Sequence, residues 1–307
     1  GTRWPPAHAP WGWPERAKGQ DTMMADNHDV RPGTPAARPA VSRRLQLPQL
    51  ALHCLEWPGE GTALLLLHPN RTNARVWDFV VAHSALRNRF LAPDARGHGL
   101  SDYPAQGYGY ADYLGDLYAL LDAMAVERVH LVGAATGGNL ALLLASESPQ
   151  RVASVTVVDP GLSLDPSISA QVQAQMRRAF RFPSLAQART GMPFSSRWSD
   201  AMREHYSQHA FASVGDGSEA VQWRYHLPGV IATEQLLEVP IWDRIDIRCP
   251  MLAIRGSHSS VFPRANMARL CAMVDGAQSA EIDADHRVSQ DNPQALARAI
   301  DRFIGAL

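Results

Sequence analysis

The segment HLVGAATGGNLALLLA, residues 130–145, joins two apolar runs through a glycine-rich turn. The run VHLVGA (129–134) has the composition of a buried strand, and the leucines and alanines after residue 138 have that of a buried helix. The glycines of GAATGG (133–138) allow backbone approaches that a Cβ atom would block. The segment therefore predicts a strand, a sharp turn and a helix, with Ala135 at the tip of the turn.

On both sides of this turn, short apolar runs alternate with amphipathic stretches from about residue 42 onward. This alternation is expected when helices cover both faces of a mostly parallel sheet, so the predicted fold class is α/β. The predicted strands are 50–57, 62–68, 89–94, 129–134, 152–159, 251–256 and 279–284. The predicted helices are 75–87, 110–124, 137–147, 263–275 and 296–304.

The pattern divides the chain into three parts. Residues 1–40 are rich in proline and carry tryptophans without a period, which predicts a disordered or non-native N-terminal extension. Residues 41–161 and 246–307 form the predicted α/β core. Residues 162–245 are helix-like and interrupted by prolines, which predicts a helical cap inserted after the sixth strand.

Composition narrows the class of partner to a small molecule. The formal net charge is −1, from 29 basic and 30 acidic side chains, so we expect neither nucleic acid nor a membrane surface as partner. The one lysine, Lys18, lies in the predicted extension, which excludes a core lysine for a Schiff base or a phosphate loop. Three widely spaced cysteines predict reduced thiols in the cytoplasm. We expect no metal, no cofactor, and a monomer or homodimer.

Three motifs occur in a fixed order: HPNRTN (68–73), PDARGHGLSD (93–102) and GAATGG (133–138). Together they resemble the α/β-hydrolase superfamily, over roughly residues 45–307. In that family the turn reads G-x-S-x-G and displays a serine nucleophile. The resemblance places Ala135 at the nucleophile position, and alanine has no nucleophilic atom. Thr136 lies one residue beyond the tip, where its side chain is expected to point away from the pocket, which disfavours it as a substitute nucleophile. Its N–H is expected in the oxyanion hole.

The resemblance also indicates the partners of the missing serine. His286, in DADHRVSQDNP, occupies the expected position of the general base, before the last helix. The segment after the predicted seventh strand, RGSHSSVFP (255–263), has no carboxylate, so Asp159, after the sixth strand, is the candidate acid. The alternative is that Asp159 caps the first cap helix. His68 and His98 are expected to hold loops by hydrogen bonds.

The oxyanion loop and the cap supply the remaining candidates. The usual His-Gly reads His68-Pro69 here, and proline has no N–H, so the second oxyanion donor is assigned to Asn70 or Arg71. We expect inward-facing arginines among Arg177, Arg178, Arg181 and Arg71 to bind a substrate carboxylate, and the alternative is that all four face solvent. A pocket wall formed by VQWRYHLPG (221–229) has the alternative of packing the cap onto the core. The substrate-binding candidates are Arg177, Arg178, Trp223 and Arg224.

The motif layout is most similar to the 2-(acetamidomethylene)succinate hydrolases of the superfamily, and cofactor-free dioxygenases and carbon–carbon hydrolases share its outline. Three functions follow. The first is a hydrolase-family protein for a small ester, amide, C–N or C–C substrate, carboxylated or not, with acyl-enzyme hydrolysis impaired by Ala135. The second is a serine-independent acid/base enzyme, a lyase, isomerase or cofactor-free oxygenase, using His286 and Asp159. The third is a non-catalytic ligand-binding protein.

Overall fold

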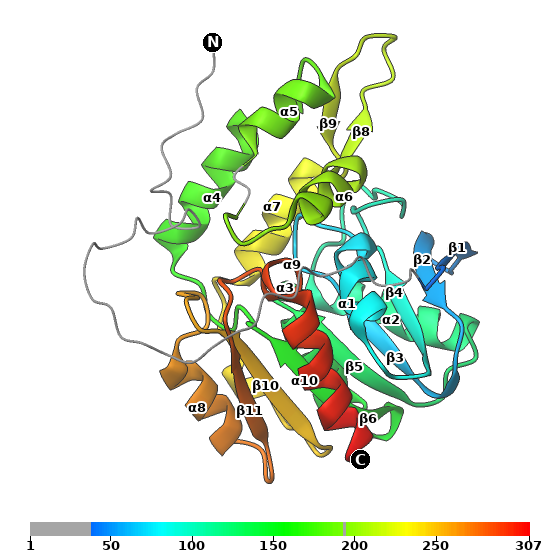
Figure 1. Ribbon diagram of the computed structural model, residues 1–307, viewed down its shortest axis with the longest axis vertical. Coiled ribbons are helices and arrows are strands. Elements are labelled where there is room, and N and C mark those ends of the chain that lie inside the picture. Colours follow the sequence, from blue (N-terminus) through cyan, green and yellow to red (C-terminus); the bar gives the residue numbers. More distant parts are fainter. Residues whose placement is uncertain (1–37, 193–194) are drawn as a thin grey trace.

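The computed structural model describes residues 38–192 and 195–307, in which eight strands form one sheet (Figure 1). The strand order is β1-β2-β4-β3-β5-β6-β10-β11. The pairs β1–β2 and β2–β4 are antiparallel, and all other neighbouring pairs are parallel. The bounds are β1 Val41–Gln46, β2 Ala51–Trp57, β3 Glu60–Leu67, β4 Asn88–Pro93, β5 Val129–Ala134, β6 Val152–Val158, β10 Met251–Gly256 and β11 Gln278–Ile282.

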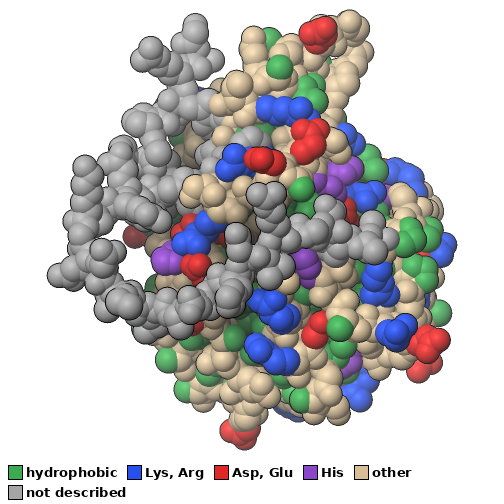
Figure 2. Space-filling model, viewed as in Figure 1, with side chains coloured by type: hydrophobic (Ala, Val, Ile, Leu, Met, Phe, Trp, Pro, Cys, Tyr) green, Lys and Arg blue, Asp and Glu red, His purple; other side chains and the backbone are tan. Residues whose placement is uncertain are grey.

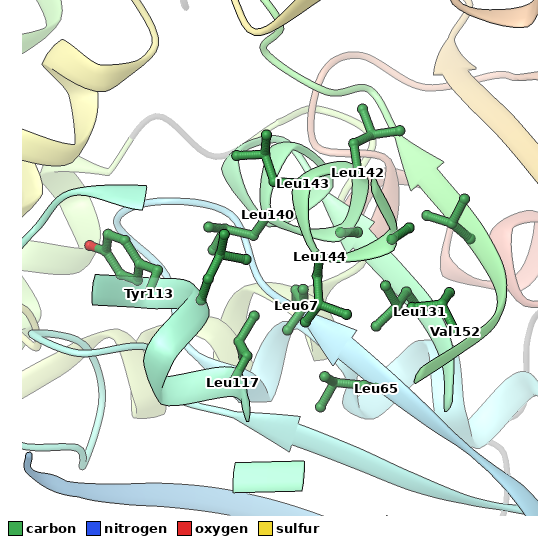
Figure 3. Packing of buried hydrophobic residues seen from close by; sticks show 14 of the residues in the cluster. Leu65, Leu67, Tyr113, Leu117, Leu131, Leu140, Leu142, Leu143, Leu144 and Val152 are labelled. Carbon is green, nitrogen blue, oxygen red and sulfur yellow. The ribbon is translucent and has the colours of Figure 1, made fainter. Parts of the chain in front are cut away.

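Helices cover both faces of the sheet, as the continuous apolar strands predict. Along β3, Leu64 and Leu66 pack with η1, α1 and α10, whereas Leu65 and Leu67 pack with α2 and α3 on the other face (Figure 3). The helices are η1 Ala74–Trp77, α1 Asp78–His83, α2 Tyr110–Ala123, α3 Thr136–Glu147, η2 Pro149–Arg151, η3 Trp242–Arg244, α8 Arg264–Ala272, α9 Val288–Asp291 and α10 Pro293–Gly305.

Each apolar run predicted as a strand is a strand in the structure, and the predicted α/β class with a mostly parallel sheet is confirmed. The strand β1 was not predicted because nearly all of its side chains are exposed and the segment lacks an apolar pattern. The helix predicted for 75–87 is shorter and begins as the 3₁₀ turn η1. Residues 1–37 of the predicted extension lie outside the described residues.

The described residues of 162–245, the segment that we call the cap, contain four α-helices above one end of the sheet and, between them, a small sheet that the sequence did not predict (Figure 1). The three strands of this sheet, in the order β7-β9-β8, are two or three residues long, too short for an alternating pattern to be recognised. Two apolar clusters lie within this region. The elements are α4 Pro166–Arg178, β7 Arg181–Phe182, α5 Leu185–Gly191, α6 Asp200–Ala210, β8 Phe211–Ser213, β9 Val221–Trp223 and α7 Leu227–Leu236.

Candidate active site

The turn between β5 and α3 has the strained geometry that its glycines predicted. Ala135 has φ 48° and ψ −117°, a left-handed conformation that a residue with a Cβ rarely adopts. A Cβ on Gly133 would lie 2.1 Å from the Gly137 carbonyl oxygen, and one on Gly137 would lie 2.2 Å from the carbonyl oxygen of Leu67. The surrounding backbone therefore fixes this conformation and displays Ala135 at the carboxyl end of β5.

Asp159 follows β6, the neighbour of β5, and its buried carboxylate accepts three hydrogen bonds. Oδ1 accepts from the Gly256 N–H at 3.0 Å, and Oδ2 accepts from the Ser259 hydroxyl at 2.6 Å and from His286 Nδ1 at 2.7 Å. The alternative role is not observed, because the side chain that caps α4 belongs to Asp165. The structure thus joins Asp159 to the loop after β10 and to the candidate base.

His286 lies between β11 and α9, and its side chain keeps 23% of its surface exposed. The carboxyl ends of the parallel strands β5, β6 and β11 meet at one edge of the sheet, so Ala135, Asp159 and the His286 loop share that edge. Donation from Nδ1 to the Asp159 carboxylate places the basic lone pair of a neutral ring on Nε2. This arrangement is that of a general base oriented by an acid.

The loop after β3 is held by His68 and His98, as the sequence predicted. His68 Nδ1 donates to the Pro69 carbonyl at 2.8 Å, and its Nε2 accepts from the Ala95 N–H at 2.9 Å. His98 Nδ1 donates to the Arg96 carbonyl at 2.9 Å. Burial, and then the neighbouring His68, lower the pKa of His98 to about 3. Both rings are therefore neutral supports of the loop.

The same loop shows how the two predicted oxyanion donors, Asn70 and Arg71, are bonded. Arg71 has φ 64°, and its N–H donates to Asn70 Oδ1 at 3.1 Å and to His98 Nε2 at 3.3 Å. The Asn70 amide in turn donates to Glu234 Oε2 at 3.0 Å, which ties the loop to α7 of the cap. Because the Arg71 N–H is engaged inside the loop, the Asn70 N–H is the better candidate. Thr136 is the first residue of α3, so its N–H has no acceptor within the helix.

The predicted substrate-binding residues divide into two groups. Arg177 and Arg178 are exposed at the end of α4, because this helix buries the face that carries Val172 and Met176. They do not line the site, and the solvent-facing alternative holds for both. Trp223 donates from Nε1 to the Ala179 carbonyl at 2.8 Å and packs within the cap.

Arg224, in contrast, lines a cleft between the cap and the core, together with Arg71. On the face drawn in Figure 2, histidine and arginine side chains gather beside α6, where the cap meets the core. Sequence reasoning missed Gln290, which also lines this cleft, and Ser259, which donates to Asp159. Both lie in the motif segments RGSHSSVFP and DADHRVSQDNP, but no pattern separated them from their polar neighbours.

Two classes of site find no support in the described part of the chain. In residues 38–192 and 195–307, no three or more His, Cys, Asp or Glu side chains converge as a metal site. Within the same ranges, no helix has the length and apolarity needed to cross a membrane.

Comparison with known proteins identifies the same fold. A family model described as alpha/beta hydrolase fold matches residues 62–293. The chain is 26% identical over 271 residues to 2-(acetamidomethylene)succinate hydrolase of Mesorhizobium japonicum, covering 87% of this chain and 96% of the relative. It is 25% identical to 3-hydroxybutyrate-oligomer hydrolase of Cupriavidus necator, covering 85% and 94% of the two chains.

Solved structures agree with these relatives. The crystal structure of E-2-(acetamidomethylene)succinate hydrolase superposes with a TM-score of 0.79 at 23% identity, covering 87% of this chain and 99% of that one. An alpha/beta hydrolase from Novosphingobium aromaticivorans has a TM-score of 0.74 at 24% identity, covering 89% and 100%. The resemblance predicted from the motifs is confirmed.

Proposed function

The chain belongs to the alpha/beta hydrolase fold family, and on this premise we propose that it has a hydrolase site for a small ester, amide, C–N or C–C substrate that is complete except for the nucleophilic oxygen at Ala135. One observation carries the proposal: His286 is hydrogen-bonded to the buried Asp159 at 2.7 Å, at the same sheet edge as the strained turn. Removal of the nucleophile from a serine triad costs about 10⁶ in turnover. Acyl-enzyme hydrolysis by this chain is therefore expected to be nearly absent.

The relatives guide the choice of substrates. One is named for an acetamidomethylene derivative of succinate and the other for an oligomer of 3-hydroxybutyrate. An amide-like C–N bond and an ester bond are both represented in these names. A test panel therefore contains aryl esters of short acids, a 3-hydroxybutyrate dimer, simple amides and a carboxylated enamide.

The decisive experiment is Ala135→Ser, assayed on this panel beside the unmodified chain. The introduced Oγ would stand at the tip of the turn, and His286 would accept its proton, so hydrolysis of at least one substrate is expected to rise by about 10⁴-fold or more. The double variant Ala135→Ser with His286→Ala is the matched control and should lose the gain. A folded single variant that hydrolyses nothing on the panel would contradict the proposal.

A second candidate function is serine-independent acid/base catalysis, and the full hydrogen bonding of Asp159 favours it. The Asp159 carboxylate accepts hydrogen bonds from Gly256, Ser259 and His286, so the acid that orients His286 is in place without a nucleophile. A base held in this way can remove a proton from an acidic C–H or from water, which contributes about 10²–10⁴-fold. Lyase, isomerase and cofactor-free oxygenation chemistry use such a step.

The two candidate functions predict opposite results for the substitutions His286→Ala and Ala135→Ser. A proton-transfer enzyme is active with Ala135 in place, and its turnover falls when His286 is replaced by alanine, while Ala135→Ser leaves it nearly unchanged. A chain with an impaired hydrolase site is inactive with Ala135 in place, does not respond to His286→Ala, and gains activity from Ala135→Ser. Binding of ligands with neither activity in any variant would leave the third function, a ligand-binding protein.

A further inference from the structure

The cleft between cap and core contains a buried polar group with no partner. Gln290, on the short helix α9 that follows His286, is 2% exposed and lines the cleft. Among the described residues, neither Nε2 nor Oε1 of its amide has a hydrogen-bond partner. A buried amide without partners costs folding free energy, and native proteins retain such groups where a ligand or an ordered water completes them.

The same cleft presents arginines without acidic partners. Within the described residues, the Arg71 guanidinium makes no hydrogen bond or ion pair. Arg224 donates from Nε and Nη2 to the Phe211 carbonyl, at 3.1 and 2.6 Å, and has no carboxylate partner there. Two arginine side chains thus line the cleft with no carboxylate bonded to either in the described residues.

The other ionisable groups that line the cleft do not cancel this charge, and the nearby Glu234 carboxylate accepts from the Asn70 amide. Arg75 is paired with Asp78, the carboxylate that also contacts His205 at 3.1 Å. His209 is neutral at pH 7, because burial and then the adjacent His205 lower its pKa to about 4. None of the residues that line the cleft is an aspartate or a glutamate. The cleft is therefore a cationic pocket with one unbonded amide.

We propose that this cleft is a carboxylate-binding subsite, in which a substrate carboxylate accepts hydrogen bonds from the Arg71 guanidinium and the Gln290 amide, with Arg224 supplying further positive charge. A planar carboxylate matches the guanidinium fork, and an amide N–H completes its remaining acceptor positions. Arg71 belongs to the oxyanion loop and Gln290 follows His286 by four residues, so the subsite adjoins the candidate active site.

The assignment rests on the proposed function only where it calls the ligand a substrate, because binding of a carboxylate needs no nucleophile. The test is therefore made on the chain with Ala135 in place, by calorimetric titration with succinate at low ionic strength. Succinamide, the neutral counterpart of succinate, and inorganic phosphate are titrated in parallel. Succinate is expected to bind, succinamide at least tenfold more weakly, and phosphate more weakly than succinate.

Variants localise the binding. Arg71→Met is expected to weaken succinate binding by about 10- to 100-fold, and Gln290→Met by about 2- to 10-fold. Arg178→Met removes an exposed arginine of the cap and is the matched control, with unchanged affinity. Circular dichroism and thermal unfolding of each variant confirm that it is folded before it is titrated.

Several outcomes overturn the proposal. It is wrong if succinate does not bind, if succinamide binds equally well, or if phosphate binds more tightly. Succinate binding that is unchanged in folded Arg71→Met and Gln290→Met also overturns it. If ordered water alone completes the Gln290 amide, Gln290→Met will leave the affinity for succinate unchanged, and Gln290 is then not part of the subsite. Succinate binding without hydrolysis by Ala135→Ser contradicts the proposed function alone, and the reverse result contradicts the subsite alone.

Discussion

Two buried aspartates in this molecule each hold a histidine with the same geometry. The distance from Nδ1 to Oδ2 is 2.7 Å both in the His53–Asp94 pair and in the His286–Asp159 pair. The surroundings of the two rings differ. His53 contacts the Ser42 hydroxyl through Nε2 at 2.9 Å, and its side chain is 6% exposed, against 23% for His286.

This difference teaches that the hydrogen bond alone does not identify a candidate catalytic pair. His53 lies within the strand β2, and its aspartate follows β4, the antiparallel neighbour of β2. Asp94 also accepts hydrogen bonds from the Ala74 and Leu100 N–H groups, so the His53–Asp94 pair connects two loops to the sheet. His286 instead lies at the edge where the parallel strands end, the edge that also carries the strained turn of Ala135.

The largest expected effect distinguishes the two pairs, because the His286–Asp159 pair should support catalysis and the His53–Asp94 pair should support stability. In the Ala135→Ser background, His286→Ala should lower kcat/KM by about 10⁴-fold or more, because the general base is lost. His53→Ala should instead lower the free energy of unfolding by about 3–5 kcal/mol, because it leaves the Asp94 charge buried without its partner. Ester hydrolysis and urea unfolding are measured for both variants. A loss of activity at both positions with unchanged stability would abolish the distinction.

The second effect concerns the position of the carboxylate that orients His286. The segment after β10 carries Ser259, whose hydroxyl is 2.6 Å from Asp159 Oδ2. In the Ala135→Ser background, Asp159→Asn should lower kcat/KM by about 10⁴-fold, since it disturbs the His286 tautomer. Addition of Ser259→Asp should recover about 10- to 100-fold of this loss, because the new carboxylate lies within reach of His286.

Steady-state kinetics of the single and double variants test this relocation. Ser259→Asn in the same Asp159→Asn background is the matched control, as it has the shape of aspartate without the charge. Equal rates for the aspartate and asparagine variants would show that position 259 cannot orient His286.

The candidate active site was predictable from sequence where its geometry is local. The turn around Ala135 follows from glycines a few residues apart, and Asp159 and His286 each follow a recognisable strand. The fold was predictable for the same reason, because apolar runs long enough to show a period became the strands and helices of the core.

Features that depend on contacts between distant segments were not predictable. The engagement of the Arg71 N–H requires His98, and the orphaned amide of Gln290 depends on how the cap lies over α9. The outward direction of Arg177 depends on which face of α4 is buried, which an amphipathic pattern with arginines on several sides leaves open.

A smaller effect concerns His98, a buried histidine whose role, like that of His53, is structural. The pKa of His98 is lowered to about 3, first by burial and then by His68, whereas an unfolded histidine titrates near about 6.5. Between these values the unfolded chain binds a proton that the folded chain excludes, so the free energy of unfolding falls as the pH falls from about 6.5 to about 4. The slope is about 1.4 kcal/mol per pH unit for this histidine.

Urea unfolding from pH 7 to pH 4.5 measures the slope, and His98→Asn should reduce it while lowering stability at pH 7. An unaltered slope in His98→Asn would mean that His98 does not contribute to acid destabilisation.

The smallest effect tests how firmly Asp159 must be held for its pair to differ from that of Asp94. Ser259→Ala removes one of three donors to the Asp159 carboxylate and leaves the Gly256 N–H and His286 in place. Loss of one such hydrogen bond costs about 1–2 kcal/mol of orientation, so kcat in the Ala135→Ser background should fall by about 5- to 30-fold with KM nearly unchanged. Ser259→Thr keeps the hydroxyl and should restore the rate. A drop in stability with an unchanged kcat would instead make Ser259 a packing residue with no part in orienting His286.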